Sequence, residues 1–223
     1  MTAEAYWLPL RQALKQQENP ERARQMKRYM RDQFDFYGID AKSVKQLTAR
    51  FIAQHQGAIP SLIDRIDWCW QQPQREWQYI GQQQLYRWRK ELRLDDQAWL
   101  TSLTLQKAWW DTVDFLASNC WGHYFRQFPD QREALLPHWI DGEDMWLQRV
   151  AILFQLKYKE QTDMEWLLRA IEPLKGASAF FIQKAIGWAL RQYAKTNPDE
   201  VRRYVEGAGL SPLSEREATK HLT

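Results

Sequence analysis

The chain is poor in the residues that build most metal sites and disulfide frameworks. Only two cysteines, Cys69 and Cys120, occur in 223 residues, and they form no CxxC pair. The four histidines are scattered, and no two of them form an H-x-x-x-H pair. Zinc sites and disulfide frameworks need ligands of these kinds at close, regular spacing. We therefore expect a function that uses no metal and no cofactor.

Long apolar runs are also absent. No stretch approaches the length that spans a bilayer, and residues 1–7 lack the basic and apolar regions of a signal peptide. We expect a cytoplasmic, monomeric protein with no membrane partner. The net charge of +3 is too small to demand a nucleic-acid partner by itself.

Glycine is scarce, with nine residues, and alternating β-branched runs and Asn-Gly or Asp-Gly turns are missing. Glycines and prolines fall between amphipathic blocks of about 10 to 20 residues, a usual helix length. Asn19-Pro20 and Asn197-Pro198 predict helix starts, and Asp95 and Thr162 are candidate caps. The sequence predicts an all-α chain of helix pairs, either a bundle or a solenoid. We favour one solenoid domain over residues 1–223, whose concave face would accommodate the many aromatic side chains.

Aromatic residues are abundant, with 13 tryptophans, and several share a predicted helix face with charged groups. Trp110 and Asp114 are four residues apart and lie one turn from each other on a helix. The adjacent face of that helix is an apolar stripe expected to pack inward, made of Trp109, Val113, Leu116 and Cys120. Asp114 is thus expected beside an indole, either as a functional carboxylate or as a structural ion-pair partner.

Arg149 is predicted to lie among apolar neighbours, next to an inward stripe formed by Trp146, Val150 and Leu153. A partly desolvated arginine usually has a fixed anionic partner, either a carboxylate or a phosphate. Two alternatives stay open: Arg149 pairs with Asp114, or it binds a phosphate.

Cations recur beside aromatic residues elsewhere. Lys184, Trp188 and Arg191 are spaced to share one helix face, and Gly187 in that helix suggests close approach by a neighbour or a ligand. Lys157 and Lys159 flank Tyr158. A basic stripe with Tyr29 beside it is predicted from Arg24, Lys27, Arg28 and Arg31, and a second basic run comprises Arg87, Arg89, Lys90 and Arg93. Such runs are usually solvated surface, but together they favour a polyanionic partner.

Four segments and the end of the chain resemble the bacterial DNA alkylation repair glycosylases of the AlkD type. The segments are residues 29–39 (YMRDQFDFYGI), 109–114 (WWDTVD), 146–152 (WLQRVAI), 183–191 (QKAIGWALR) and 213–218 (LSEREA). The resemblance implies a right-handed superhelical solenoid of HEAT-like helix pairs whose concave face binds double-stranded DNA. It also implies hydrolysis of the N-glycosidic bond of N3- and N7-alkylated purines, including 3-methyladenine and 7-methylguanine, in base excision repair.

The resemblance also implies roles for individual residues. Asp114, Trp110 and Trp188 match the aspartate and two tryptophans that surround the damaged nucleotide's sugar. Arg149 matches the arginine that holds the DNA backbone, and Tyr29 matches a tyrosine near the lesion. Residues 40–45 depart from the family's Pro-x-Arg-like segment, and either Lys42 or Lys45 is the candidate replacement for its phosphate contact. Lys157, Lys184 and Arg191 complete the candidate DNA-binding set.

These residues suit the reaction chemically. An alkylated purine is cationic, so it leaves as a neutral base without a general acid, while positive charge develops on the deoxyribose. Asp114 would stabilise that charge and orient water, and the faces of Trp110 and Trp188 would each add ~0.5–2 kcal/mol by cation–π attraction. No Schiff-base lysine is evident, so we expect a monofunctional glycosylase. Recognition through backbone and charge predicts that bulky N7 adducts are tolerated.

Two other functions remain open from the sequence. One is a non-catalytic paralogue that binds damaged or branched DNA, which would have no use for a central carboxylate. The other is a HEAT-type scaffold for a protein partner, with tryptophans as interface anchors.

Overall fold

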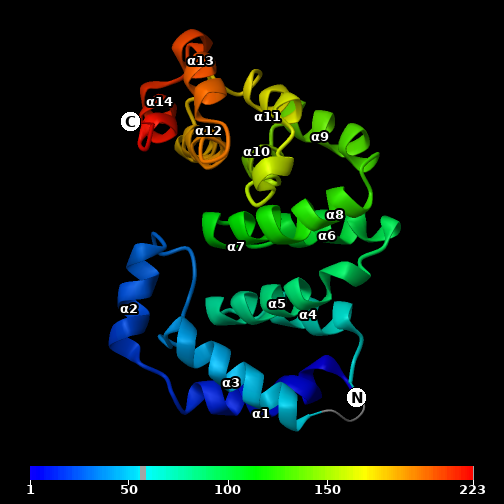
Figure 1. The fold of residues 1–223 in the computed structure, drawn as a ribbon. Coiled ribbons are helices and arrows are strands. Elements are labelled where there is room, and N and C mark those ends of the chain that lie inside the picture. The colour runs from blue at the N-terminus through cyan, green and yellow to red at the C-terminus, as the bar shows by residue number, and fades with distance from the viewer. Residues whose placement is uncertain (56–58, 223) are drawn as a thin grey trace. The chain divides into compact units, whose positions relative to one another are not determined.

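The structure is a computed structural model that describes residues 1–55 and 59–222 (Figure 1). Every regular element in these ranges is a helix, and the one extended pairing is an isolated bridge between Asp35 and Gln74. The prediction of an all-α chain is confirmed. Among the described residues, no helix has the length and apolarity needed to cross a membrane.

The helices form two compact units, Met1–Trp88 and Arg89–Thr223. The first contains α1 (Ala3–Lys15), α2 (Pro20–Tyr29), α3 (Ala41–Gln54), α4 (Leu62–Gln71) and α5 (Arg75–Trp88). The second contains η1 (Arg89–Glu91), η2 (Leu94–Asp96), α6 (Gln97–Leu105), α7 (Trp110–Phe115), η3 (Leu116–Trp121), α8 (Gly122–Gln127), α9 (Gln131–Asp141), α10 (Met145–Leu153), η4 (Lys159–Gln161), α11 (Met164–Ile171), α12 (Phe180–Tyr193), α13 (Pro198–Ala208) and α14 (Pro212–Thr219). The assignment of residues 1–223 to one domain stays a prediction.

Helices close together in the chain pack against each other within each unit. In the first unit α4 packs against α5, and in the second α10 packs against α9 and α11, while α12 packs against α13 and α14. Short connections make this arrangement natural, because each amphipathic helix buries its apolar face on the next one. The packing is that of stacked helix pairs. The superhelical sense and the concave face stay predictions from the family resemblance.

Many of the tryptophans fill the cores. Trp7, Trp70, Trp77 and Trp121 are each at most 1% exposed. In the first unit Trp7 stacks on Phe51 with ring centroids 5.4 Å apart. Full burial of aromatic side chains supplies much of the hydrophobic free energy of such small helical cores. Core packing therefore accounts for a large part of the tryptophan content of this chain.

The predicted helix starts are confirmed, and the two weaker caps are wrong by one residue each. Asn19 caps α2 by accepting a hydrogen bond from the backbone N–H of Arg22 at 2.9 Å. Asn197 precedes α13 but makes no side-chain cap. Asp96 rather than Asp95 precedes α6, and Asp163 rather than Thr162 caps α11, accepting from the backbone N–H of Trp166 at 3.2 Å.

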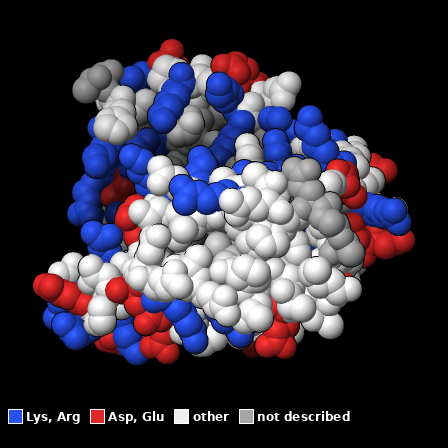
Figure 2. Space-filling model, turned by 90° about the horizontal axis from the view of Figure 1, so that it is seen from below, with Lys and Arg blue, Asp and Glu red and all other residues white. Residues whose placement is uncertain are grey.

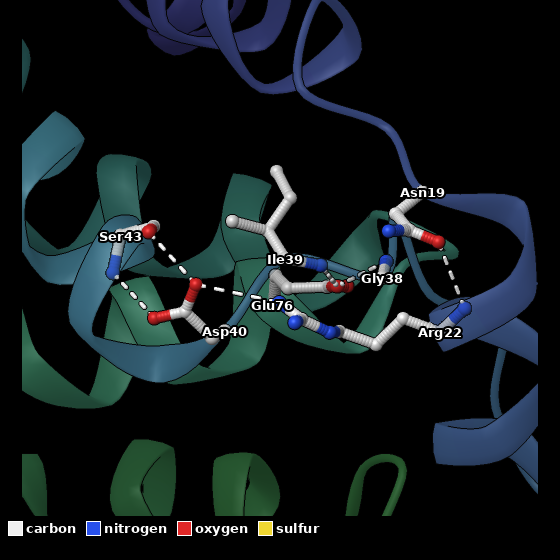
Figure 3. Close-up of polar contacts among 7 residues, drawn as sticks. All are labelled: Asn19, Arg22, Gly38, Ile39, Asp40, Ser43 and Glu76. Atoms are coloured by element: carbon white, nitrogen blue, oxygen red, sulfur yellow. Dashed lines mark hydrogen bonds and ion pairs between the residues drawn. The ribbon is translucent and has the colours of Figure 1, made fainter.

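A buried carboxylate holds the loop between α2 and α3. Glu76 is fully buried at the start of α5, and one of its oxygens accepts a backbone N–H bond from Tyr37 at 3.1 Å. The other accepts from the backbone N–H groups of Gly38 and Ile39 at 2.9 and 3.3 Å (Figure 3). Gly38 has φ +82°, and a Cβ there would collide with the backbone of α2, lying 2.6 Å from the nitrogen of Ala23. The loop therefore requires both this carboxylate and this glycine.

The same loop sets the first residues of α3. Asp40 caps α3 by accepting from the backbone N–H and hydroxyl of Ser43 at 3.0 and 2.8 Å (Figure 3). Arg22 of α2 approaches Asp40 at 3.4 Å. Helix α3 thus begins with an aspartate cap.

The predicted basic stripe is only partly helical. Helix α2 ends at Tyr29, and Arg31 follows it with φ 54°, so Arg31 does not continue the helix face. Lys27 is engaged by Asp35 at 2.8 Å. No residue of α2 is fully buried, so Arg24 and Arg28 present their charge from an exposed helix.

Candidate active site

The candidate site lies in the second unit, where α7, α10 and α12 are neighbours. Helix α10 packs against both α7 and α12. Asp114 lies near the end of α7, and Arg149 lies in the middle of α10. From Leu116 the helix continues as a π-helical segment, η3, before α8. Single π-helical turns inside α-helices are frequent at functional sites.

Asp114 and Arg149 form a bidentate salt bridge. Arg149 donates from Nε to Oδ1 of Asp114 at 2.7 Å and from Nη2 to Oδ2 at 2.9 Å. The remaining terminal nitrogen, Nη1, donates to the backbone carbonyl oxygen of Phe181 in α12. The sequence left open whether Arg149 pairs with Asp114 or binds a phosphate. The structure shows the pair.

The two members of the pair are not equally buried. The side chain of Arg149 is 5% exposed, whereas that of Asp114 is 15% exposed. The carboxylate is therefore the outer end of the pair. Each carboxylate oxygen carries two lone pairs, so each can accept a further hydrogen bond from water or a ligand.

Burial and the ion pair act on the pKa of Asp114 in opposite directions. Burial raises the pKa of Asp114, the hydrogen bonds and charge of Arg149 lower it, and the nearby Asp111 raises it; the net effect is upward. Without Arg149 the carboxyl would face the full cost of desolvation. The guanidinium, which stays charged in proteins, therefore favours the ionised form of Asp114.

An aromatic cluster packs beside the pair. The rings of Trp109, Trp146 and Phe181 lie 5.1 to 5.7 Å apart, centroid to centroid. Trp109 immediately precedes α7, Trp146 is in the first turn of α10, and Phe181 is in the first turn of α12. The cluster thus joins the three helices that carry the candidate site. The stripes predicted to pack inward are confirmed at Val113, Leu116, Cys120, Val150 and Leu153, each at most 1% exposed. Trp109 and Trp146, the first residues of the two stripes, are half-buried.

Trp110 and Trp188, the predicted sugar-facing tryptophans, are both half-buried. Trp110 is the first residue of α7, and Trp188 lies in the middle of α12. Together with Arg149 they occupy three neighbouring helices. A half-buried indole keeps part of its surface accessible, as contact with a ligand requires.

Lys184 and Arg191, predicted to bind DNA, both form salt bridges with the carboxylate of Glu217. Lys184 donates to Oε1 of Glu217 in α14 at 2.6 Å, and Arg191 approaches Oε2 at 2.5 Å. The hydrogen bonds and charges of these two cations lower the pKa of Glu217 to about 2. Their position on one face of α12 therefore has a structural explanation, and their contact with DNA stays a prediction.

Gly187 is required by the same helix contact. A Cβ at this position would lie 2.7 Å from the backbone oxygen of Ser214 and closer still to Cβ of Glu217. Ser214 is fully buried, and its hydroxyl donates to the backbone carbonyl oxygen of Gln183 at 2.9 Å. Of the two readings of Gly187, close approach by a neighbour is confirmed, and the neighbour is α14.

The two remaining predicted DNA contacts, Lys157 and Tyr29, belong to different units of the chain. Lys157 is exposed after α10, and its ammonium donates to Oδ1 of Asn119 in η3 at 2.6 Å. Tyr29 is the last residue of α2 in the first unit and is 72% exposed. Both positions are accessible, and their roles remain predictions. Figure 2 shows Lys and Arg side chains, in blue, at many places on the visible surface.

Sequence reasoning missed Glu217 and Phe181. Glu217 lies in residues 213–218, which the resemblance already included, and two cations on one face of α12 were a signal that an acid partner was needed. Phe181 contributes a backbone carbonyl, for which a sequence carries no signal. Within the described ranges, no three side chains of His, Cys, Asp or Glu lie together as a metal site would require.

With this geometry in view, comparisons with known proteins identify the family. The family model described as DNA alkylation repair enzyme matches residues 10–222. The chain belongs to the DNA alkylation repair enzyme family. A solved structure described as a predicted DNA alkylation repair enzyme from Enterococcus faecalis is similar, with 35% identity and a TM-score of 0.84. The similarity covers 93% of this chain and 97% of that one. A comparison with curated proteins gave no match.

Proposed function

We propose that this protein is a monofunctional DNA glycosylase that removes cationic N3- and N7-alkylated purines from double-stranded DNA. The observation that best supports this proposal is the bidentate salt bridge between Arg149 and Asp114, in which the carboxylate is the more exposed partner. Family membership gives a role in alkylation repair, and this pair supplies a group suited to one reaction within that role.

The chemistry needs a fixed negative charge. As the bond between the cationic base and the sugar breaks, positive charge moves to the deoxyribose, and the base leaves neutral. Asp114, oriented by Arg149, would stabilise the developing charge and position a water molecule for attack on the anomeric carbon. Trp110 and Trp188, on the two helices that flank α10, would present their ring faces to the same cation. No proton donor is needed for the leaving group.

The test is release of 7-methylguanine from a methylated duplex, with alkali to reveal abasic sites. We expect Asp114→Asn to lower the excision rate by roughly 10²–10³-fold, the usual loss for one preorganised charge partner, with duplex binding retained. Glu143→Gln, the same loss of charge at an exposed position outside the pair, is the matched control and should remain active. Equal excision by Asp114→Asn and the unaltered protein would refute the assignment. Duplex binding without any excision would instead identify a DNA-binding paralogue.

A further inference from the structure

A cluster of positive charge in the second unit is not used by the proposed reaction. It lies where η1 packs against α8. Arg89 and Lys90 come from η1, and His123 and Arg126 come from α8. The two residues of η1 belong to the basic run at residues 87–93, to which the candidate active site gives no role.

This cluster is well separated from the candidate active site. Helices α7, η3 and α8 follow one another without a break from Trp110 to Gln127, and α7 and α8 form opposite ends of this helical segment (Figure 1). At a rise of about 1.5 Å per residue, Asp114 and Arg126 are roughly 15–20 Å apart along the helix axis. One phosphate group therefore cannot contact both places.

The guanidinium of Arg126 is held in place by an aromatic ring. It lies over the ring of Tyr158, 3.9 Å from the ring centroid, and the residue is exposed. Arg169 of α11 lies over the ring of Trp166 at the same distance, and it also pairs with Glu133 at 2.8 Å. Arg126 forms no such ion pair with a carboxylate of the described residues. Its guanidinium is thus preorganised and available to an anion.

His123 reports an excess of positive charge in the cluster. Its ring is half-buried, and burial lowers the pKa of His123. The charges of Arg89, Lys90 and Arg126 lower this pKa further. Lys90 is exposed and, within the described part of the chain, has no acidic partner. A helix C-terminus carries roughly half a negative charge, which offsets only part of three cations, so the excess favours an anion with several charges.

We propose that this cluster binds phosphate groups of the DNA backbone beyond the nucleotide at the candidate active site. The planar guanidinium of Arg126 can contact two oxygens of a phosphate, Lys90 adds a point charge, and the imidazole of His123 has an N–H group to donate. Phosphates recur at close spacing along a DNA strand, which suits cations that come from two elements. Membership in a DNA repair family favours DNA over an acidic protein segment. The proposal adds a second contact surface to the proposed function and rests on duplex DNA being the partner.

The salt dependence of duplex binding tests these phosphate contacts. We would measure the affinity of the whole protein for an unmodified duplex that extends beyond the candidate active site, by fluorescence anisotropy at several salt concentrations. We expect Arg126→Gln and Lys90→Gln each to reduce the slope of log K against log salt by about 0.9, the value for one phosphate contact. Lys90→Gln alters an exposed side chain and should leave the fold intact.

The matched control is Arg169→Gln. This variant removes the same charge from an arginine that also lies over an aromatic ring but is already paired with Glu133. We expect its salt slope to equal that of the unaltered protein.

The titration of His123 is a second, independent measurement. Bound phosphates would add negative charge beside the imidazole, so the pKa of His123 should rise when the duplex is added. NMR spectra of the ring protons measure this change. The ring signals of His138, which is exposed on α9, are the internal reference and should not respond to the duplex.

Three results would overturn the proposal. The first is an unchanged salt slope in both Arg126→Gln and Lys90→Gln. The second is an equal decrease in Arg169→Gln, which would show a long-range effect of net charge. The third is a pKa of His123 that rises with a glutamate-rich peptide but not with the duplex, which would identify an acidic protein segment as the partner. In each case, release of 7-methylguanine by the unaltered protein would leave the glycosylase proposal standing.

Discussion

Arg149 holds both carboxylate oxygens of Asp114, at 2.7 and 2.9 Å, and uses its third donor group on the backbone of Phe181. One guanidinium therefore links α7, α10 and α12, the helices that carry the proposed catalytic groups. A lysine ammonium is a single point charge and cannot reproduce the planar, bidentate donor geometry of the guanidinium. The orientation of Asp114 thus depends on the identity of Arg149 as well as on its charge.

We expect Arg149→Lys to lower excision by roughly 10²-fold, the loss typical of a catalytic group misplaced by about 1 Å. Burial raises the pKa of Asp114, and Arg149 opposes that increase. In Arg149→Lys this opposition should be weaker, so Asp114 should become protonated at a higher pH. The acid limb of the pH–rate profile should therefore shift to higher pH. The measurement is the pH dependence of single-turnover release of 7-methylguanine. An acid limb that stays in place would mean that Arg149 does not control the ionisation of Asp114.

Gly187 and Gly207 give a matched pair of glycine-to-alanine changes. At Gly187 a Cβ would meet the backbone of α14, whereas at Gly207, an exposed position of α13, nothing lies within 4 Å. We expect Gly187→Ala to lower the free energy of unfolding by about 1–3 kcal/mol through overpacking. Gly207→Ala should raise it by about 0.5–1 kcal/mol, because alanine favours the helix. Urea unfolding of both variants measures these changes, and a neutral Gly187→Ala would show that α14 can move without cost.

Glu217 should make stability depend on pH in the acid range. Its folded-state pKa of about 2 lies below its ordinary value of 4.5. A carboxyl with a depressed pKa stabilises the fold above its ordinary pKa, and that contribution is lost as the pH falls through the folded pKa. Glu217→Gln should therefore melt below the unaltered protein at neutral pH, and the two melting temperatures should converge between pH 4.5 and about 2.

The control for this series is Glu215→Gln, an exposed change on the same helix, which should melt like the unaltered protein throughout. A constant offset between Glu217→Gln and the unaltered protein down to pH 2 would contradict the role of the ion pairs with Lys184 and Arg191. Glu217→Gln also tests whether Lys184 and Arg191 contact DNA. If these two cations also reach phosphates, releasing them from Glu217 should steepen the salt dependence of duplex binding.

Glu76 should control the loop between α2 and α3. Glutamine in its place would present an N–H₂ group to backbone N–H groups that now donate to a carboxylate. We expect Glu76→Gln to lower the free energy of unfolding by about 1.5–3 kcal/mol, the range for hydrogen bonds to a charged group. Amide hydrogen exchange at Tyr37, Gly38 and Ile39 should quicken. Unchanged protection of these amides, relative to the exposed control Glu18→Gln, would show that the loop holds itself without the carboxylate.

Local sequence determined the helices of this protein and the residues that could belong to its site. The spacing of apolar residues and the Asn-Pro pairs specify helix faces and helix starts, because helical periodicity and capping act over three or four residues. Val113, Val150 and Leu153 are buried as their spacing predicted. The motifs in the expected order were sufficient to suggest the family to which the chain belongs.

Only the tertiary structure decided which charges meet. Asp114 and Arg149 are 35 residues apart in the chain, and Lys184 and Glu217 are 33 apart. No local rule pairs residues at such separations, since the partner of a buried charge depends on which helices pack together. The same holds for Glu76, whose partners are backbone groups of a loop 37 to 39 residues away. Long-range packing thus orients the carboxylate of Asp114, links α12 to α14 through Glu217, and fixes the loop between α2 and α3 through Glu76.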